Sequence, residues 1–350
     1  MGDARRTRAY IGSFTSAGGR GVLVAELAPD GAALEVVGES DAVADPSYLA
    51  LAPGGALLYA VSETTEGAAA AFAVGAAEDP APRLLGAPVP VDGAAPTHLA
   101  LAAGHLLTAN YTSGSVSVLP LAADGSPGPV ADVARHRGSG PVAGRQEAPH
   151  AHQVLPDPSG RWVLAVDLGT DSVTVSALDP ATGTLRPHGT TALRPGTGPR
   201  HLAFHPDGGH AYVLNELEPT VTVCRWDAAA GVLEALRETP VVPEDATGDR
   251  YPSELVVAPD GRFLWAAVRG HDSLAVLALD ASGEKAELTA SVPCGGHWPR
   301  DLALGPSGRH LYAANERSGD VTWFTVDQET GLPSRAGSVP APAASCVVFG

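Results

Sequence analysis

The chain has 350 residues with a net charge of −17, 41 glycines, 31 prolines and three cysteines far apart in the sequence. So acidic a chain, without a block of basic residues, excludes nucleic acid and anionic membranes as partners. Three scattered cysteines exclude a disulfide framework or a zinc cluster. The first residues, MGDARRTRAYIG, lack the apolar core of a signal peptide, and no run of 18 apolar residues exists. We therefore expect a cytoplasmic protein.

The first predicted strands form an incomplete unit. YIGSF, from Tyr10, resembles the second strand of a four-stranded repeat, and GVLVAEL, from Gly21, resembles the third. A first strand for this unit is missing from the N-terminal part of the chain. Abundant glycine and proline favour short strands and tight turns over a helical bundle.

Six complete copies of a repeat follow. Each has an alternating apolar strand, a turn rich in proline, glycine and aspartate, and a second apolar strand; a strand of the form VxV usually comes next. The copies begin at Asp45, Ala95, Ala151, Gly198, Tyr251 and Trp298. A period of roughly 47 to 55 residues, with several strands in each copy, is typical of propeller blades.

The last predicted strand, SCVVF from Ser345, supplies the strand that the first unit lacks. Pairing it with the N-terminal strands would close a ring and remove exposed sheet edges. The sequence therefore predicts an all-β protein, a seven-bladed β-propeller with four-stranded blades, forming a single domain over residues 1–350.

One hairpin of this propeller suggests a site. Arg200 and Glu216 lie equally far from Gly208 in the predicted turn, so antiparallel pairing should place them opposite each other. The first strand of a blade is the innermost, so both residues should lie at one mouth of the central channel. Turn residues such as Asp207 and Asp260 are expected to be structural, and His205 and His210 to lie at the surface.

Aligning the turns extends this prediction to the other blades. The Arg200 position gives Ser47, Thr97, His152, Arg200, Ser253, Arg300 and Ser345. The Glu216 position gives Phe14, Glu63, Tyr111, Leu168, Glu216, Arg269 and Glu316. A neighbouring position adds Asn110, Asp167, Asn215 and Asn315. Histidine, arginine and carboxylate groups gathered there would attract a small anionic molecule.

A structural role is the alternative for these pairs, because propellers often join blades by inward-facing ion pairs. It is favoured for Arg300 with Glu316, which repeats the same spacing two blades later. A functional role is favoured for Arg200 with Glu216, because His152 belongs to the adjacent blade and Arg269 to the next.

The same segments resemble the seven-bladed-propeller lactonase family, which includes the propeller type of 6-phosphogluconolactonase and fungal carboxymuconate cyclases. The motifs that carry the resemblance are YIGSFT, GSGPVAGRQEAPHAH, DLGTDSV, GPRHLAFHPDG with NELE, PDGRFLWAAVRGHDSL and PRDLALGPSGRHLYAANE. By motif, the family's suspected catalytic group falls on His152 (or its neighbour His150), Arg200, Glu216 and Arg269. Candidate substrate contacts in these motifs are His150, Asp167, His201, Asn215, His271, Arg300 and Glu316.

Two departures from the family pattern concern the substrate. Val268 stands where the family usually has an asparagine before RGHDS, and Ser13 begins SFT where the family favours TYT. The first could alter hydrogen bonding beside Arg269. The substrate therefore need not be the familiar sugar lactone.

The resemblance implies a lactonase that hydrolyses a small anionic lactone. A carboxylate held against an arginine has a lowered pKa and is a poor base, so Glu216 is expected to orient its partners. His152 is the better base, because its pKa naturally lies near the working pH. Arg200 and Arg269 would bind the anionic group or stabilise the oxyanion.

Three alternatives stay open at this point. One is a cycloisomerase, or a lactone-forming or tailoring enzyme acting on a carboxylated metabolite. Another is a non-catalytic propeller that binds proteins, which would need a large exposed apolar patch. A channel metal held by Asp167, Asn215 and Glu216 is the third, but the nearby arginines would repel a cation. We therefore expect no metal and no cofactor, and a monomer or homodimer.

Overall fold

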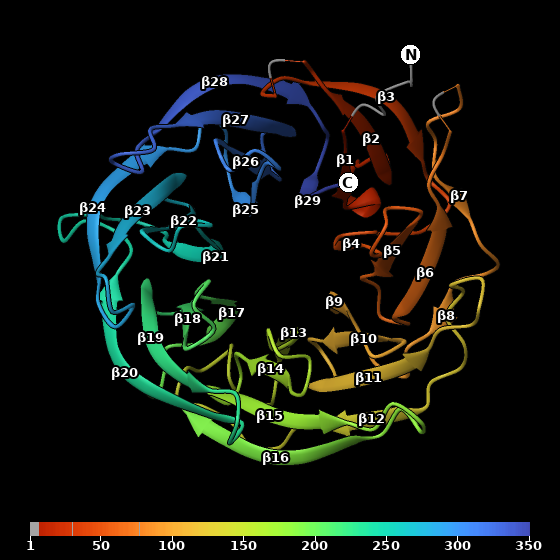
Figure 1. The fold of residues 1–350 in the computed structure, drawn as a ribbon, viewed down its shortest axis with the longest axis horizontal. Helices are drawn as coiled ribbons and strands as arrows, with labels where there is room; N and C mark the ends of the chain where they lie inside the picture. The colour runs from red at the N-terminus through yellow and green to blue at the C-terminus, as the bar shows by residue number, and fades with distance from the viewer. Residues whose placement is uncertain (1–6, 30, 77) are drawn as a thin grey trace.

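The computed structural model describes residues 7–29, 31–76 and 78–350. Its strands form seven sheets arranged as a ring (Figure 1). We call the region around the ring axis, bordered by the innermost strand of each sheet, the central channel. The predicted seven-bladed β-propeller is confirmed. Residues 1–6, part of the segment predicted to lack a signal core, lie outside the described residues.

Blades are numbered here from the N-terminus. Blade 1 contains β1 (Arg8–Ser13), β2 (Val22–Leu27), β3 (Leu34–Ser40) and β29 (Ala344–Phe349), with a 3-10 helix, η1 (Thr15–Ala17), after β1. Blade 2 contains β4 (Leu49–Leu51), β5 (Leu57–Ser62), β6 (Ala68–Ala73), β7 (Arg83–Leu84) and β8 (Val89–Pro90). Blade 3 contains β9 (Pro96–Ala102), β10 (His105–Asn110), β11 (Ser115–Pro120) and β12 (Asp132–Arg135).

Blade 4 contains β13 (Ala151–Pro156), β14 (Val163–Asp167), β15 (Ser172–Leu178) and β16 (Leu185–Ala192). Blade 5 contains β17 (Pro199–Phe204), β18 (His210–Asn215), β19 (Thr220–Asp227) and β20 (Val232–Pro240). Blade 6 contains β21 (Tyr251–Val257), β22 (Phe263–Arg269), β23 (Ser273–Leu279) and β24 (Ala286–Pro293). Blade 7 contains β25 (Pro299–Leu304), β26 (His310–Asn315), β27 (Asp320–Val326) and β28 (Pro333–Pro340).

Each sheet is antiparallel, and in blades 2 to 7 the strands follow one another in chain order from the channel outward, whereas in blade 1 β29 is the innermost strand. Blade 2 departs from the four-stranded plan, because β7 and β8 both pair with β6 and together take the place of one outer strand. The blades pack face to face through side chains that alternate along the strands. Between blades 5 and 6, for example, Val221 and Val223 share a buried apolar cluster with Leu264 and Ala275.

Blade 1 closes the ring as predicted. Strand β29, from the C-terminal end of the chain, pairs with β1, with Ile11 opposite Val347 and Ala9 opposite Phe349 (Figure 1). Arg8 and Gly350 exchange two backbone hydrogen bonds of 2.9 Å. The innermost strand of blade 1 therefore comes from the opposite end of the chain from its other strands.

Deletion of residues 341–350 should greatly destabilise the protein, because it removes β29 and exposes the backbone groups of β1. We expect aggregation, or a melting temperature at least ~10 °C lower, as measured by thermal unfolding and gel filtration. A circular permutant that links the two natural ends and opens the exposed turn between Glu329 and Thr330 keeps every strand and should melt near the wild type. Wild-type melting of the truncated chain would contradict the closure.

Candidate active site

A β-bulge interrupts six of the seven innermost strands at corresponding positions. In blade 5, Pro199 pairs with Asn215 and His201 pairs with Leu214, so Arg200 has no opposite residue in the ladder. Successive residues of a regular strand point to opposite faces, whereas a bulge redirects a side chain. The bulge therefore allows both Arg200 and His201 to reach the central channel.

This bulge corrects the predicted pairing of Arg200 with Glu216. The N–H of Glu216 donates to the carbonyl of Gly198, 2.7 Å away, so Glu216 is not directly opposite Arg200. The two side chains nevertheless meet, with Arg200 Nε 3.2 Å from Glu216 Oε2. Both are buried, at 3% and 5% exposure. The predicted contact exists, but the bulge produces it rather than cross-strand pairing.

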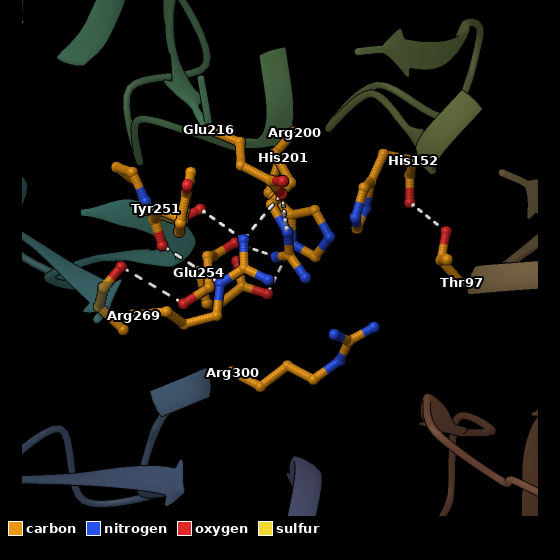
Figure 2. Close-up of polar contacts among 12 residues, drawn as sticks. Thr97, His152, Arg200, His201, Glu216, Tyr251, Glu254, Arg269 and Arg300 are labelled. Carbon is orange, nitrogen blue, oxygen red and sulfur yellow. Dashed lines mark hydrogen bonds and ion pairs between the residues drawn. The ribbon is translucent and has the colours of Figure 1, made fainter. Parts of the chain in front are cut away.

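Three arginines contact the Glu216 carboxylate, two of them visible in Figure 2. Arg269 Nη2 lies 2.8 Å from Oε2, and Arg145 Nη2 lies 2.5 Å from Oε1. Burial alone would raise the pKa of Glu216, but Arg269, Arg200 and Arg145 together lower it from 4.5 to about 2. Glu216 is therefore a carboxylate at neutral pH, and the cluster has a local excess of positive charge.

Arg145 is a residue that the turn alignment missed. It lies on the loop between β12 and β13, outside the strands that repeat, so repeat spacing could not place it. Its neighbour Gln146 is buried and donates to the carbonyl of Leu168 at 2.7 Å, which fixes the loop across the channel mouth. The motif GSGPVAGRQEAPHAH contained this arginine. That motif was the signal in the sequence from which Arg145 could have been recognised as a site residue.

Backbone carbonyls hold the other two arginines. Arg200 Nη1 donates to the carbonyl of Ser253 in blade 6, and Arg269 Nε donates to the carbonyl of Tyr251 at 3.2 Å. Burial, followed by the charge of Arg269, lowers the pKa of Arg200 to about 9, which leaves it protonated at neutral pH. Its Nε–H is not aligned for a hydrogen bond to any residue that the structure describes. Arg200 therefore keeps donor capacity that a bound anion could use.

His152 occupies the bulge of blade 4, as the turn alignment predicted. Its backbone carbonyl accepts a 3.0 Å hydrogen bond from Thr97 Oγ1 of blade 3, and its ring lies edge-on to His201 with centroids 5.1 Å apart (Figure 2). Burial, then the charge of Arg200, holds the pKa of His152 well below its usual range. The imidazole is therefore neutral and has a lone pair for a proton, but its pKa does not lie near the working pH, which corrects the expectation from the sequence.

Arg300 and Glu316 lie in blade 7 on the opposite side of the channel from His152. Arg300 is 3.5 Å both from Glu316 Oε2 and from Glu63 Oε1, and it lies over the ring of Phe14. These contacts are longer than those around Glu216, and Figure 2 shows the Arg300 side chain reaching toward the centre of the group. The predicted pair of Arg300 with Glu316 forms, but Arg300 also contacts Glu63.

Asp167 and His150 hold the loop that carries Arg145. Asp167 is fully buried and accepts hydrogen bonds from the N–H groups of His150 and Thr170 and from His136 Nδ1. His150 Nδ1 lies 2.9 Å from the carbonyl of Tyr111, and its ring stacks on that of Tyr111. Both residues are therefore engaged in local contacts, and His152 is the histidine that reaches the other channel histidines.

Asn215 and His271 also have local partners. Asn215 Nδ2 donates to Thr220 and Thr222, both at 2.9 Å, and His271 Nδ1 lies 2.7 Å from the hydroxyl of Ser273. These contacts join strands within one blade. They support a structural role beside the site for both residues.

The two departures from the family pattern lie away from the channel chemistry. Val268 is buried in the apolar cluster between blades 5 and 6. Ser13 Oγ donates to the carbonyl of Gly21 at 2.7 Å. Neither side chain contacts Arg269 among the hydrogen bonds and ion pairs of the described residues.

His201 belongs to a second polar group that the sequence only partly indicated. Its Nδ1 lies 2.6 Å from Glu254 Oε2 of blade 6, and Glu254 is hydrogen-bonded to Asp301 of blade 7. All three follow the bulge position in their strands by one residue. The turn alignment stopped at the bulge position, so Glu254 and Asp301 were missed.

The proposed metal ligands already have other partners. Both oxygens of Glu216 contact guanidinium groups, and Asp167 accepts three hydrogen bonds from protein groups. Among the described residues, His205, Asp207 and His210 form a group close enough to hold a metal ion. They bond to one another in the turn between β17 and β18. The expectation of a metal-free channel stays a prediction.

A cavity lies away from these residues. A space of about 470 Å³ separates blades 3 and 4, with Val116, Val163 and Leu185 among its apolar lining residues. None of the predicted site residues lines it. The candidate site therefore rests on buried charge and geometry, which point to the channel. No helix in the described parts of the chain is long and apolar enough to cross a membrane.

Comparison with known proteins gives consistent matches over nearly the full chain. The sequence model described as "Lactonase, 7-bladed beta-propeller" matches residues 8–349. A 6-phosphogluconolactonase of Bacillus subtilis is 35% identical over 348 residues, which cover 97% of each chain. A 6-phosphogluconolactonase of Formosa agariphila is 29% identical, covering 92% of this chain and 93% of the relative. The structure of a periplasmic gluconolactonase from Pseudomonas aeruginosa matches with a TM-score of 0.90 and 29% identity, covering 98% of each chain.

Glu216→Gln should destabilise the protein by about 3–5 kcal/mol at pH 7, because it leaves buried arginines without a carboxylate. The folded-state pKa of Glu216 is depressed, so its contribution is complete above its ordinary value of 4.5 and is lost as the pH falls toward about 2. The difference between wild type and variant should therefore shrink in that window, as measured by urea unfolding at several pH values.

Glu238→Gln is the matched control, because Glu238 forms an ion pair of 2.8 Å with Arg194 that is half exposed on the arginine side. It should cost no more than about 1 kcal/mol. Equal losses in the two variants would contradict the importance of the buried cluster.

Proposed function

Because the chain belongs to the lactonase family of seven-bladed β-propellers, we propose that it hydrolyses a small anionic lactone in the central channel. The observation that carries this proposal is the buried cluster of Arg145, Arg200 and Arg269 around Glu216, close to the neutral imidazole of His152. Anion-binding groups beside a base are what lactone hydrolysis requires.

The proposed substrate class is a phosphorylated sugar lactone such as 6-phosphogluconolactone. The Bacillus subtilis relative bears the name of that activity and matches this chain over its whole length. The excess positive charge in the channel fits a phosphate or carboxylate on the substrate, because arginine binds such groups with its planar fork. A neutral lactone would leave that charge without a partner.

Arg200 and Arg269 are proposed to bind the anionic group or the oxyanion. Both are fixed by Glu216 and by backbone carbonyls of blade 6, so their guanidinium groups are oriented before the substrate arrives. Preorganised donors of this kind stabilise developing negative charge without rearrangement during the reaction. Arg300 is a further candidate contact from the opposite side of the channel.

His152 is proposed to be the base and Glu216 an orienting group. The pKa of about 2 makes Glu216 too weak a base at neutral pH, whereas the neutral imidazole of His152 can take a proton from water. The resulting hydroxide would add to the lactone carbonyl carbon. Collapse of the tetrahedral intermediate would break the ring C–O bond, and the departing oxygen would recover the proton.

The direct test is a panel of lactones assayed by pH-stat. We expect hydrolysis of 6-phosphogluconolactone, and at least ~10-fold lower kcat/KM for unphosphorylated gluconolactone, because the charge-assisted contacts to phosphate are lost. Equal rates for the two lactones would contradict anion recognition. The absence of hydrolysis with every lactone would contradict the proposed function itself.

His152→Ala should lower kcat by about 10²–10⁴-fold, the usual contribution of general base catalysis. His205→Ala removes a histidine at the opposite end of an inner strand, in the turn before β18, and should leave kcat nearly unchanged. Steady-state kinetics on the two purified variants decide the matter. Similar losses of kcat in both variants would mean that the site has been assigned to the wrong face of the propeller.

Arg200→Lys tests whether Arg200 binds the substrate as a fork. The lysine keeps a positive charge beside Glu216 but cannot make two parallel hydrogen bonds, so KM should rise by about 10-fold or more. Arg194→Lys, at a surface ion pair with Glu238, is the control and should keep the wild-type KM. If Arg200→Lys lowers only the melting temperature and not substrate affinity, Arg200 holds the blade and does not bind the anion.

A further inference from the structure

A chain of hydrogen-bonded side chains lies beside the proposed base and runs through three consecutive blades. His201 Nδ1 lies 2.6 Å from Glu254 Oε2, and Glu254 is hydrogen-bonded to Asp301 (Figure 2 labels the first two). Glu254 Oε1 accepts from the N–H of Leu255 at 2.9 Å, and Asp301 Oδ2 accepts from the N–H of Val347 at 2.7 Å. The chain is therefore fixed at both carboxyl groups.

Two buried carboxyl groups in contact cannot both be ionised without strong repulsion. Burial raises the pKa of Glu254 to about 7, although Arg200 opposes the rise. Burial, and then the charge of Glu254, raise the pKa of Asp301 well above its usual range. Such a pair titrates as a unit, and its negative charge appears when Glu254 loses its proton near pH 7. The other charged or titratable groups that face the pair are His201, Tyr48 and Cys346.

The bond to Glu254 fixes the tautomer of His201. When Glu254 is ionised it can only accept a hydrogen bond, so Nδ1 of His201 then carries the proton and Nε2 bears the lone pair. That Nε2 atom is buried and has no hydrogen-bond partner among the residues that the structure describes, and the same is true of His152 Nδ1. The two rings lie edge-on, 5.1 Å apart, with His98 on another side of His201 at 5.5 Å. Two nitrogen atoms capable of exchanging a proton are thus close together.

The two histidines differ in whether a carboxyl group contacts the ring. Arg200, Arg300 and Arg269 all oppose a positive charge on His152, and no carboxylate contacts its ring among the described residues. The same arginines oppose a positive charge on His201, but Glu254 lies in direct contact with its Nδ1. A proton that leaves water is therefore better placed on His201 than on His152.

We propose that His201, paired with Glu254, takes up through His152 the proton that the attacking water loses, so that these residues form one proton-transfer unit. This inference rests on the proposed lactonase function. His152 would receive the water proton at Nε2 and give its Nδ1 proton to His201 Nε2, after a ring rotation or across one water molecule. His201 would become an imidazolium beside the Glu254 carboxylate. The proton returns by the same path to the oxygen released when the lactone ring opens.

This unit predicts a particular pH dependence. When the Glu254–Asp301 pair takes up its second proton, it loses the negative charge that stabilises the His201 imidazolium. In the wild type, kcat should therefore fall as the pH drops through about 7. Asp301→Leu removes the side-chain hydrogen bond by which Asp301 lowers the pKa of Glu254, so the acid limb should move to higher pH. His152 and His201, with lowered pKa values, are neutral throughout this range.

Glu254→Gln should lower kcat by about 10-fold or more with little change in KM, because a neutral amide cannot stabilise the imidazolium. It should also abolish the acid limb near pH 7. Gln153→Ala is the matched control: Gln153 stands at the same strand position in blade 4 and accepts from the N–H of Leu202 at 2.7 Å. That variant should lower the melting temperature and leave the pH profile of kcat unchanged.

The outcomes separate this inference from the proposed function. Loss of activity in His152→Ala with a wild-type pH profile in Glu254→Gln and Asp301→Leu would overturn the proton-transfer unit and leave the lactonase proposal intact. NMR tests the proton-transfer unit independently, because it needs no turnover of a substrate. Nitrogen-15 NMR should find His201 in the Nδ1–H tautomer, and carbon-13 NMR should find a carboxyl group titrating near pH 7 that disappears in Glu254→Gln. Ordinary acidic titration of both carboxyl groups would overturn the inference even if no lactone were hydrolysed.

Discussion

The β-bulge in the innermost strands is the constraint on which the channel chemistry depends. A regular strand would send Arg200 and His201 to opposite faces of blade 5, and one of them would enter the apolar packing between blades. The extra residue of the bulge lets both reach the channel, where Arg200 meets Glu216 and His201 meets Glu254. Because the bulge recurs in six of the seven blades, each of those blades can contribute two successive residues to the same region.

Burying so many charges requires that each be paired. The ion pairs join different blades and also orient the arginines of the site. Glu216 of blade 5 contacts Arg269 of blade 6 and Arg145 from the loop before blade 4. An unpaired charge at such depth would destabilise the fold by several kcal/mol. The arginines are therefore held by the requirements of the fold in the orientation that anion binding needs. The same side chains therefore contribute to the stability of the fold and to the proposed function.

The sequence predicted those features of the protein that follow from its repeat. Period, strand order and ring closure could be inferred because every blade repeats the same pattern, and the complementary strands at Tyr10 and Ser345 indicated how the ring closes. The register of the Arg200 hairpin was wrong, since counting from Gly208 assumes a regular ladder and the bulge adds one residue. Arg145 could not be placed, because its loop belongs to no repeat. Glu254 and Asp301 were missed because the turn alignment compared only the bulge position of each blade, and these residues follow it by one.

The two carboxylate groups of the channel differ in protonation because their neighbours differ. Glu216 is surrounded by guanidinium groups, which keep it ionised far below neutral pH, while Glu254 faces a second carboxyl group and a histidine. Separation of this kind between similar side chains commonly marks the division between electrostatic and proton-transferring roles in an active site. In the proposed mechanism Glu216 would fix the cations that hold the substrate, and Glu254 would stabilise the positive charge that the reaction creates on His201. Arg200 contacts the first carboxylate and also lowers the pKa of the second. Arg200 also opposes a positive charge on His201, and an anionic substrate bound at Arg200 would weaken that opposition and so favour the His201 imidazolium.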